Sequence, residues 1–444
     1  MQKNISYGLR RIFSLLPFYG LALGVPFEST YAATFITFDP PGSTATLASS
    51  INTAGAIVGN YRDGGTFHAF LRKPGGAFIT FDPPNSISTS ARSINDAGAI
   101  TGDYFVVGSI SHGFVRDPGG TLTTFDPPGS ISVAAESINS AGAIAGHYSS
   151  DGVRFHGFVR ERGGAFTTFD PPGSIQTTAA SINASGAIVG TYFDGTTRHG
   201  YLRDPAGTFT IFDGPGSTFT LSASINAAGA ITGNYFDGSW RAFVRDPNGA
   251  FTTFGPPGPT PGATSINTAG AITGGYSDGF RTHGFLRDPG GDFTLFDPPD
   301  STYTFGTGIN DASAVIGEYV NGDMYHGFLL CEPPVITNIA ASPKTLSPPN
   351  RDFIPTSVTV TTSEGCGTGS CKIISVSSNE RTNSGVDWSV TGDLTLVLRA
   401  DRLGSGEGRI YTILVECTDG AGNIIRETVD VSVPHDQGSK VDHN

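Results

Sequence analysis

Short apolar runs alternate with turn-forming residues along most of the chain, and this pattern predicts many short β-strands. A typical unit has four runs: one ending in S-I-N, then A-I-x-G-x-Y, then H-G-F-L-R, and finally F-T-T-F. A pair such as Asp194-Gly195 separates the second and third runs and supplies the positive φ angles of a tight hairpin. Asp-Pro-Pro follows the fourth run, where proline cannot donate a ladder hydrogen bond. The pattern therefore predicts an all-β fold.

The four-strand unit recurs seven times, at intervals of 41 to 44 residues. Its most regular markers are the Asn of S-I-N and the Tyr of G-x-Y. They occur at Asn52, Asn95, Asn139, Asn183, Asn226, Asn267 and Asn310, and at Tyr61, Tyr104, Tyr148, Tyr192, Tyr235, Tyr276 and Tyr319. Four strands in a unit of this length match one blade of a β-propeller. We therefore expect residues 34–331 to form a seven-bladed β-propeller with four-stranded blades.

The two ends of the repeat region are expected to pair with each other. The seventh unit ends at Leu330 without a fourth strand, whereas Phe35–Asp39 precedes the first S-I-N and has no unit of its own. An N-terminal strand that completes the last blade removes two open sheet edges. The fourth strand also needs cover on both faces, because Phe166 and Phe169 are three residues apart and point to opposite sides. Blades packed between two neighbours provide that cover.

The S-I-N, G-x-I-x-G and H-A-F or H-G-F elements resemble the bacterial extracellular HAF-repeat family. The resemblance covers about residues 34 to 330, and His68-Ala69-Phe70 matches the family tripeptide, whereas most other copies have Gly in the middle. The resemblance implies export and a propeller-like repeat, without a defined activity.

Residues 332–436 show a different pattern, with apolar residues at every second position of several strands. These are Val358 and Val360; Leu394, Leu396 and Leu398; Tyr411, Ile413 and Val415; and Val429, Val431 and Val433. Alternating strands over about 100 residues predict an immunoglobulin-like β-sandwich. The segments 346–354 and 417–423 resemble bacterial extracellular Ig-like modules. A polar tail, 437–444, follows and shows no anchor signal.

All four cysteines fall in or beside this second domain, at Cys331, Cys366, Cys371 and Cys417. Export makes disulfides the expected state. Assigning the strands in immunoglobulin order places all four at one pole, where three connectivities are possible. We favour Cys366 with Cys371 and Cys331 with Cys417. Zinc is the weaker alternative, because the spacing lacks the order of a zinc site.

The N-terminus, residues 1–33, is typical of a secretory signal peptide. Lys3, Arg10 and Arg11 precede an apolar stretch at 12–25, and Thr30-Tyr31-Ala32 is a small-x-small cleavage site. Arg10-Arg11-Ile12-Phe13 also resembles the core of a twin-arginine signal. No second apolar run of membrane length follows, so a secreted or extracellular monomer is expected, with the periplasm or cell surface as alternatives.

Net charge and composition limit the classes of molecule that the chain is expected to bind. The formal net charge is −13, and no basic cluster follows the extreme N-terminus, which argues against nucleic acid. Only 15% of residues are charged, while 61 are Gly and 29 are Pro, as expected of many tight turns.

The most conspicuous polar residues occur once in nearly every unit. They are His68, His112, His156, His199, His283 and His326, with Arg241 in the fifth copy, and the F-D-P-P aspartates Asp39, Asp82, Asp126, Asp170, Asp213 and Asp297. A catalytic site needs unlike groups that converge, not equal groups in a ring. We therefore interpret the histidines as structural and the aspartates as turn-forming.

Two positions vary inside the repeat and are better candidates for binding. They are the residue before S-I-N (Ser49, Arg92, Glu136, Ala180, Ala223, Thr264 and Thr307) and the middle of G-x-Y (Asn60, Asp103, His147, Thr191, Asn234, Gly275 and Glu318). If the first strand is innermost, the former group faces a central channel. Arg92, Glu136, Asp103, His147 and Glu318 are the candidate binding residues. Drift at tolerant positions is the alternative interpretation.

No catalytic motif is present: G-x-S-x-G, the phosphate-binding loop, H-E-x-x-H and the EF-hand loop are all missing from the sequence. Asp419 and Asn423 offer oxygen ligands for calcium, although a plain polar turn is the preferred interpretation. No catalytic residue, other cofactor or metal site is expected.

These observations favour an exported, non-enzymatic binding or scaffold protein that recognises carbohydrate, peptide or protein on a propeller face. A propeller-type polysaccharide hydrolase or lyase is the first alternative, and a structural matrix protein is the second. An enzyme should gather carboxylates or histidines from unlike positions at one mouth of the channel.

Overall fold

The computed structural model describes residues 34–108, 110–255, 260–332, 334–362, 369–380, 386–404, 408–419 and 423–434. These residues form thirty-five strands, β1 to β35, and no helix, so the all-β prediction is confirmed for them. The described part of the chain accordingly contains no helix that could cross a membrane. The predicted signal peptide, Cys366 and the polar tail lie outside the described residues.

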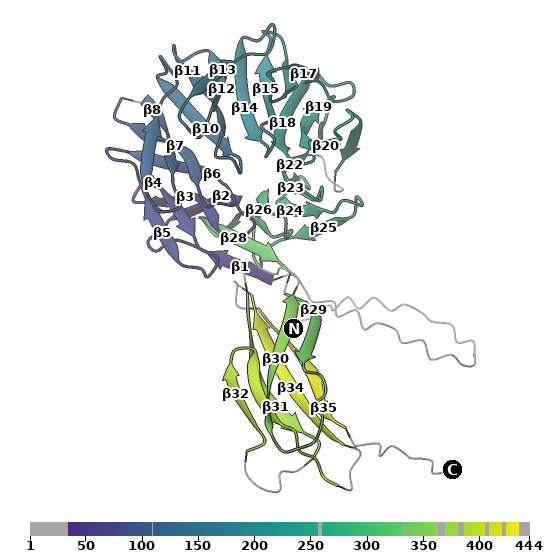
Figure 1. The fold of residues 1–444 in the computed structure, drawn as a ribbon. Coiled ribbons are helices and arrows are strands. Elements are labelled where there is room, and N and C mark those ends of the chain that lie inside the picture. Colours follow the sequence, from purple (N-terminus) through teal and green to yellow (C-terminus); the bar gives the residue numbers. More distant parts are fainter. Residues whose placement is uncertain are drawn as a thin grey trace, which may run out of the picture. The chain divides into compact units, whose positions relative to one another are not determined.

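Strands β1 to β28 fall into seven sets of four, arranged around a ring (Figure 1). The first strands are innermost: β2 (Ala45–Ile51), β6 (Ser88–Ile94), β10 (Ser132–Ile138), β14 (Gln176–Ile182), β18 (Phe219–Ile225), β22 (Thr260–Ile266) and β26 (Tyr303–Ile309). The second strands are β3 (Ile57–Asp63), β7 (Ile100–Val106), β11 (Ile144–Ser149), β15 (Ile188–Phe193), β19 (Ile231–Phe236), β23 (Ile272–Ser277) and β27 (Val315–Asn321).

The two outer positions of each set hold the H-G-F-L-R and F-T-T-F segments. The third strands are β4 (Thr66–Arg72), β8 (Ile110–Arg116), β12 (Phe155–Arg160), β16 (Arg198–Arg203), β20 (Trp240–Arg245), β24 (Thr282–Arg287) and β28 (Met324–Cys331). The outermost strands are β5 (Phe78–Phe81), β9 (Leu122–Phe125), β13 (Phe166–Phe169), β17 (Phe209–Phe212), β21 (Phe251–Phe254), β25 (Phe293–Phe296) and β1 (Thr34–Phe38).

Each set is an antiparallel ladder in chain order, as in β10-β11-β12-β13. The last set takes its fourth strand from the other end of the repeat region. β1 pairs with β28, with Thr34 opposite Cys331 and Phe38 opposite Gly327. The N-terminal strand therefore occupies the edge of the seventh set, where the sequence places it.

The buried core lies between neighbouring sets. In the third set, Ile144 and Phe158 are fully buried. Gly146 is required beside them, because a Cβ there would lie 2.1 Å from the Ala134 carbonyl oxygen and 2.9 Å from the Phe158 ring. Glycine in G-x-Y thus permits close approach of the innermost strand and the buried ring.

The glycine in the middle of H-G-F is also required by close packing. A Cβ at Gly157 would lie 2.3 Å from the ring of Phe169, and this ring is buried. The two copies with alanine at this position, Ala69 and Ala242, have their facing rings, Phe81 and Phe254, only half-buried. The Gly-to-Ala difference is therefore reflected in the packing of the outermost strand.

Arginine and phenylalanine stack between neighbouring sets. Arg72 of β4 lies over the ring of Phe38 in β1, with its Cζ 5.1 Å from the centroid, and Arg160 of β12 lies over Phe125 of β9 in the same way at 4.8 Å. Cation–π contacts of this kind stabilise partly desolvated guanidinium groups.

Asparagine side chains join the innermost strands into a closed cycle. Asn52 Nδ2 donates to the carbonyl oxygen of Asn95, and each following S-I-N asparagine donates to the next in the same way. Asn310 returns the bond to the Asn52 carbonyl at 3.1 Å. The seven bonds therefore have no free end.

The C-terminal residues form two sheets, β29-β30-β33-β32 and β31-β34-β35. Their strands are β29 (Ile336–Ser342), β30 (Phe353–Thr362), β31 (Ser370–Ser378), β32 (Trp388–Gly392), β33 (Thr395–Arg399), β34 (Arg409–Thr418) and β35 (Ile424–Val433). Val358 and Leu396 of one sheet share a buried core with Ile413 and Val431 of the other. Alternate residues of each strand therefore face the space between the sheets.

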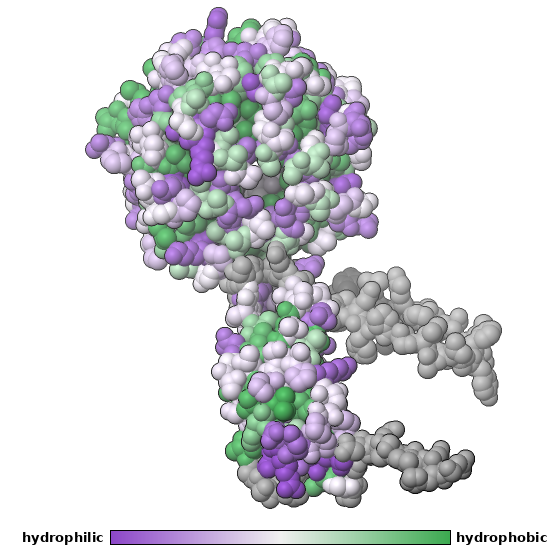
Figure 2. Space-filling model, viewed as in Figure 1, coloured by the Kyte–Doolittle hydropathy of each residue, from purple (hydrophilic) through white to green (hydrophobic). Residues whose placement is uncertain are grey.

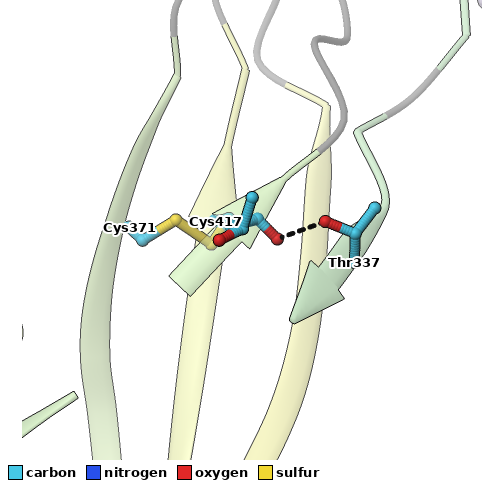
Figure 3. Close-up of a disulfide and its surroundings, with 4 residues drawn as sticks. Thr337, Cys371 and Cys417 are labelled. Atoms are coloured by element: carbon cyan, nitrogen blue, oxygen red, sulfur yellow. Dashed lines mark hydrogen bonds between the residues drawn. A yellow bond between two sulfur atoms is a disulfide. The ribbon is translucent and has the colours of Figure 1, made fainter. Parts of the chain in front are cut away.

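The favoured disulfide pairing is wrong. Cys371 of β31 is bonded to Cys417 of β34, and the two residues lie directly opposite each other with their Cα atoms 4.0 Å apart (Figure 3). This bond excludes both Cys366–Cys371 and Cys331–Cys417. Strand register decided the pairing, and register was not visible in the location of the cysteines at one pole. Cys331 is disulfide-bonded as well.

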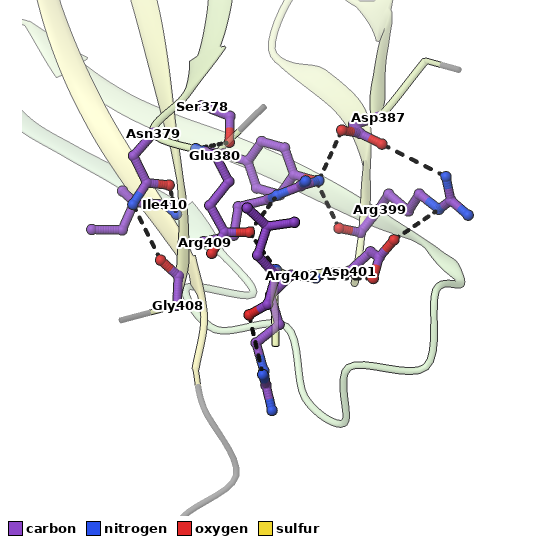
Figure 4. A network of polar contacts seen from close by, with 12 residues as sticks. Ser378, Asn379, Glu380, Asp387, Arg399, Asp401, Arg402, Gly408, Arg409 and Ile410 are labelled. Atoms are coloured by element: carbon purple, nitrogen blue, oxygen red, sulfur yellow. Dashed lines mark hydrogen bonds and ion pairs between the residues drawn. The ribbon is translucent and has the colours of Figure 1, made fainter. Parts of the chain in front are cut away.

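One buried cluster of charges lies in this C-terminal region. The Arg409 side chain is 3% exposed; its Nη1 is 2.9 Å from Asp387 Oδ2 and its Nε is 3.5 Å from Glu380 Oε2 (Figure 4). A buried guanidinium without such partners would be strongly destabilising, so this network holds the ends of β32 and β34 in place.

Candidate functional site

The variable residue before S-I-N is a β-bulge in every innermost strand. The register of β10 against β11 shifts between Ala135 and Ser137, which leaves Glu136 without an opposite residue. The other six innermost strands shift at the same place. A bulge re-aims its side chain away from the regular pleat.

All seven bulge residues line one cavity of about 150 Å³ at the centre of the ring. They are Ser49, Arg92, Glu136, Ala180, Ala223, Thr264 and Thr307. A further cavity of about 230 Å³ is lined by the S-I-N segments, Asp96 and Asp311. The space-filling view shows the ring hollowed at its centre (Figure 2). We call this space the central channel.

Four of the five candidate residues cluster beside the central channel, and two of them, Arg92 and Glu136, line its cavity. Arg92 Nε contacts Asp103, and Arg92 Nη1 lies 3.1 Å from Glu136 Oε2. His147 Nδ1 is 3.9 Å from Glu136 Oε1. Arg92 and Asp103 come from the second set, whereas Glu136 and His147 come from the third. We call these four residues the channel network.

Burial and charge determine the protonation of the channel network. Burial opposes the charge on Arg92, but Asp103 and Glu136 outweigh it and raise the pKa of this guanidinium. Burial raises the pKa of Asp103 despite the neighbouring Arg92. Burial and the Arg92 charge lower the pKa of His147 to about 4, so His147 is neutral at pH 7.

The channel network keeps one unused polar atom. His147 Nδ1 is buried and makes no hydrogen bond to the described residues, and the ring packs edge-on against Phe155. A buried ring nitrogen without a partner is costly.

Glu318 lies apart from the channel network, on β27 of the seventh set. Its backbone neighbours are Phe305 of β26 and Gly327 of β28. Burial raises the pKa of its carboxyl to about 7. Phe305 was missed by the sequence reasoning, although its position also varies from copy to copy (Leu47, Ser90 and Ala134 in the first three).

The repeated histidine and aspartate form a single structural element. In the third set, His156 Nδ1 lies 2.7 Å from Asp170 Oδ2, and the His156 ring packs against Tyr148. The same pair occurs at His68–Asp82, His112–Asp126, His199–Asp213, His283–Asp297 and His326–Asp39. Asp170 also accepts a hydrogen bond from Thr177 of the next set at 2.6 Å. We call this arrangement the His–Asp clasp.

All three residues of the clasp are replaced where the fifth set meets the sixth. Arg241 stands in place of His, Gly255 in place of Asp and Pro261 in place of Thr. Arg241 instead pairs with Asp237, with Nε 2.7 Å from Oδ2. Among the described residues, the fifth set therefore lacks the His–Asp pair that the other six sets have.

The calcium candidates form a hydrogen-bonded turn. Asn423 donates from its backbone N–H to Asp419 Oδ1 at 2.8 Å and from its side chain to Oδ2 at 2.9 Å. Among the described residues there is no group of three or more His, Cys, Asp or Glu arranged to hold a metal.

Known proteins resemble this chain only in structure, and at low sequence identity. No protein-family model matches the chain, and no curated protein matches it. Among solved structures, a streptogramin B lyase is 11% identical, with 67% of this chain and 98% of that chain covered and a TM-score of 0.45. Virginiamycin B lyase from Staphylococcus aureus is 10% identical, with 67% and 99% covered and a TM-score of 0.47. A puromycin hydrolase is 14% identical, with 66% and 52% covered and a TM-score of 0.46. Likeness at this level says nothing of this chain's activity.

Proposed function

We propose that this chain is an exported binding protein that holds a polar ligand in the central channel. In this proposal residues 34–331 are a seven-bladed β-propeller of the HAF-repeat type, and residues 332–436 are an immunoglobulin-like sandwich that acts as a spacer or second contact. The closed cycle of seven asparagine bonds supports the blade count, and the disulfide between Cys371 and Cys417 supports an oxidising compartment.

The channel network carries the proposal. Arg92, Asp103, Glu136 and His147 are, with Glu318, the charged or imidazole residues at two positions where the other blades have different side chains. Structural needs common to all blades do not explain them, because the clasp and the asparagine cycle already meet those needs. A ligand that accepts from Arg92 and donates to Glu136, the two residues of the network that line the cavity, does explain their presence together.

A polysaccharide hydrolase or lyase is the second candidate, because the network contains two carboxyl groups and an imidazole from unlike positions. Glycosidases need two carboxyl groups that flank the scissile bond. Asp103 is only 2% exposed and lies against Arg92, so it is poorly placed to reach a substrate. Binding without turnover is therefore the better-supported function.

The test uses mature protein beginning at residue 34, applied in parallel to a glycan array and to a polysaccharide hydrolase and lyase screen. Glu136→Gln and Arg92→Ala should no longer bind the glycan that the wild-type protein binds on the array. Glu161 is an exposed turn residue outside the channel, so Glu161→Gln is the matched control and should bind the glycan as wild type does. Turnover of any polysaccharide that Glu136→Gln abolishes would replace the binding proposal with the enzymatic one. Binding that survives both channel variants would contradict the proposed site.

A further inference from the structure

Glu318 occupies a position at which other blades join their neighbours, but it does not make that contact. Asn60 Oδ1 accepts the Ala91 backbone N–H of the next blade at 2.9 Å, and Asn234 Oδ1 accepts that of Ala263 at 2.9 Å. The Glu318 carboxylate has no hydrogen bond or ion pair to any described residue. Its side chain is therefore available for another partner.

Two aromatic residues of the innermost strand of the same blade lie beside this carboxylate. Phe305 is directly opposite Glu318, and Tyr303 is two residues away on the same side of β26. The Tyr303 and Phe305 rings are stacked, with centroids 6.2 Å apart and planes at 11°. The Tyr325 ring lies 6.1 Å from Tyr303. All three rings keep exposed surface.

A glycine on the neighbouring blade makes room for this arrangement. A Cβ at Gly275 would lie 2.3 Å from the Phe305 ring. Position 275 is Asn, Asp, His, Thr or Glu in the other copies. Glycine at position 275 of the sixth blade therefore leaves the space that the Phe305 ring of the seventh blade occupies.

The electrostatic environment leaves Glu318 without a counter-ion. Burial alone raises its pKa, and no neighbouring positive charge offsets that effect. The titratable groups beside it are Tyr303 and, through Tyr303, Tyr325; burial and Glu318 raise the pKa of Tyr303 to about 12, so it is neutral at pH 7. The basic residue of the channel network, Arg92, is bound to Asp103 and Glu136.

We infer that Glu318, Tyr303 and Phe305 form a subsite for an organic ammonium group carried by the ligand. The carboxylate supplies the counter-ion, and the stacked rings present π-faces to the alkyl-substituted cation. A hydrated metal ion fits less well, because the rings offer no oxygen ligands besides one phenol. The subsite deepens the proposed function by naming a chemical group of the ligand, and it rests on that function only in assigning the ligand to the central channel.

The test compares choline with 3,3-dimethylbutan-1-ol, which has the same shape without the charge, by calorimetric titration of mature protein at pH 8. Choline should bind, and the neutral alcohol should bind at least about tenfold more weakly. Glu318→Gln should weaken choline by a similar factor, and Phe305→Leu should weaken it in part. Glucosamine against glucose forms a second pair, which distinguishes an amino sugar from a quaternary amine as the source.

The pH profile adds a readout that a structural role would not move. Lowering the pH from 8 to 6 protonates Glu318 and should weaken choline binding to wild type about tenfold, but not to Glu318→Gln. Glu161→Gln, the exposed control, should bind choline as wild type does. A protein that binds choline but retains no glycan on the array separates this inference from the proposed function. Equal binding of charged and neutral probes, unchanged binding to Glu318→Gln, or no binding of either amine overturns the inference.

Discussion

His326 Nδ1 lies 2.7 Å from Asp39 Oδ2, and the two residues are 287 positions apart in the chain. Asp39 Oδ1 also accepts a hydrogen bond from Thr46 at 2.6 Å. One carboxylate therefore connects the strand that completes the last set with the last set itself and with the first. The same arrangement joins the third set to the fourth through Asp170 and Thr177, and here it closes the ring.

Removal of this clasp should be more damaging than removal of another. We expect Asp39→Ala to lower the free energy of unfolding by about 1–3 kcal/mol, because it leaves a buried hydroxyl and an imidazole without their acceptor. Asp126→Ala is the matched control. Among the described residues the Asp126 side chain bonds only to His112, and Val133 stands where Thr46 does. Urea unfolding monitored by fluorescence gives both values. Equal losses would mean that closure depends on the β1–β28 ladder alone.

The asparagine cycle predicts a pH-dependent cost for one substitution. Asn139 is 6% exposed; its Nδ2 donates to Asn183 O and its Oδ1 accepts the Ala143 N–H. Asn139→Ala should cost about 2–3 kcal/mol, because two buried backbone groups lose their partners. Asn139→Asp keeps the acceptor and regains a donor only when protonated, so it should be more stable at pH 5 than at pH 8. A flat pH profile for this variant relative to wild type would contradict the assignment.

Glu318 should make the fold less stable as the pH rises. Its pKa moves from 4.5 in the unfolded chain to about 7 when folded, so the folded protein holds this proton more tightly. The cost of ionisation is absent below about pH 4.5 and complete above about pH 7. Glu318→Gln should therefore stabilise the protein by about 1–3 kcal/mol at pH 8 and by little at pH 4.5. Thermal unfolding at the two pH values checks this, and a stabilisation independent of pH would point to packing instead.

The junction without a clasp should accept one. The triple variant Arg241→His, Gly255→Asp, Pro261→Thr restores all three partners and should raise the free energy of unfolding by about 1 kcal/mol. Gly255→Asp alone should not, because its Cβ would lie 3.2 Å from Pro261 Cγ. Hydrogen exchange of β21 and β22 amides measures the local effect. No added protection in the triple variant would show that the clasp does not strengthen a junction.

Period and strand number were readable from the sequence because every copy carries the same Asn, Tyr and turn residues. The adjacency of Arg92 and Glu136 was also readable, since both precede S-I-N in consecutive copies. Asp103 and His147 were candidates as well, but their contacts with Arg92 and Glu136 were not readable, because these depend on a bulge that turns side chains of two strands toward each other. The pairing of Cys371 with Cys417 depends on the register of β31 against β34, which local patterns do not specify.

The asparagine cycle also bears on how such a gene can change. Near-identical repeats invite unequal recombination, which adds or removes whole units, and an open solenoid tolerates this because each repeat contacts only its neighbours. Here Asn310 must reach Asn52, and β1 must reach β28, so a chain with one unit more or fewer has to close at a different curvature or leave two edges bare. A single substitution at the bulge therefore leaves the ring closed, whereas a change in the number of units alters the closure itself.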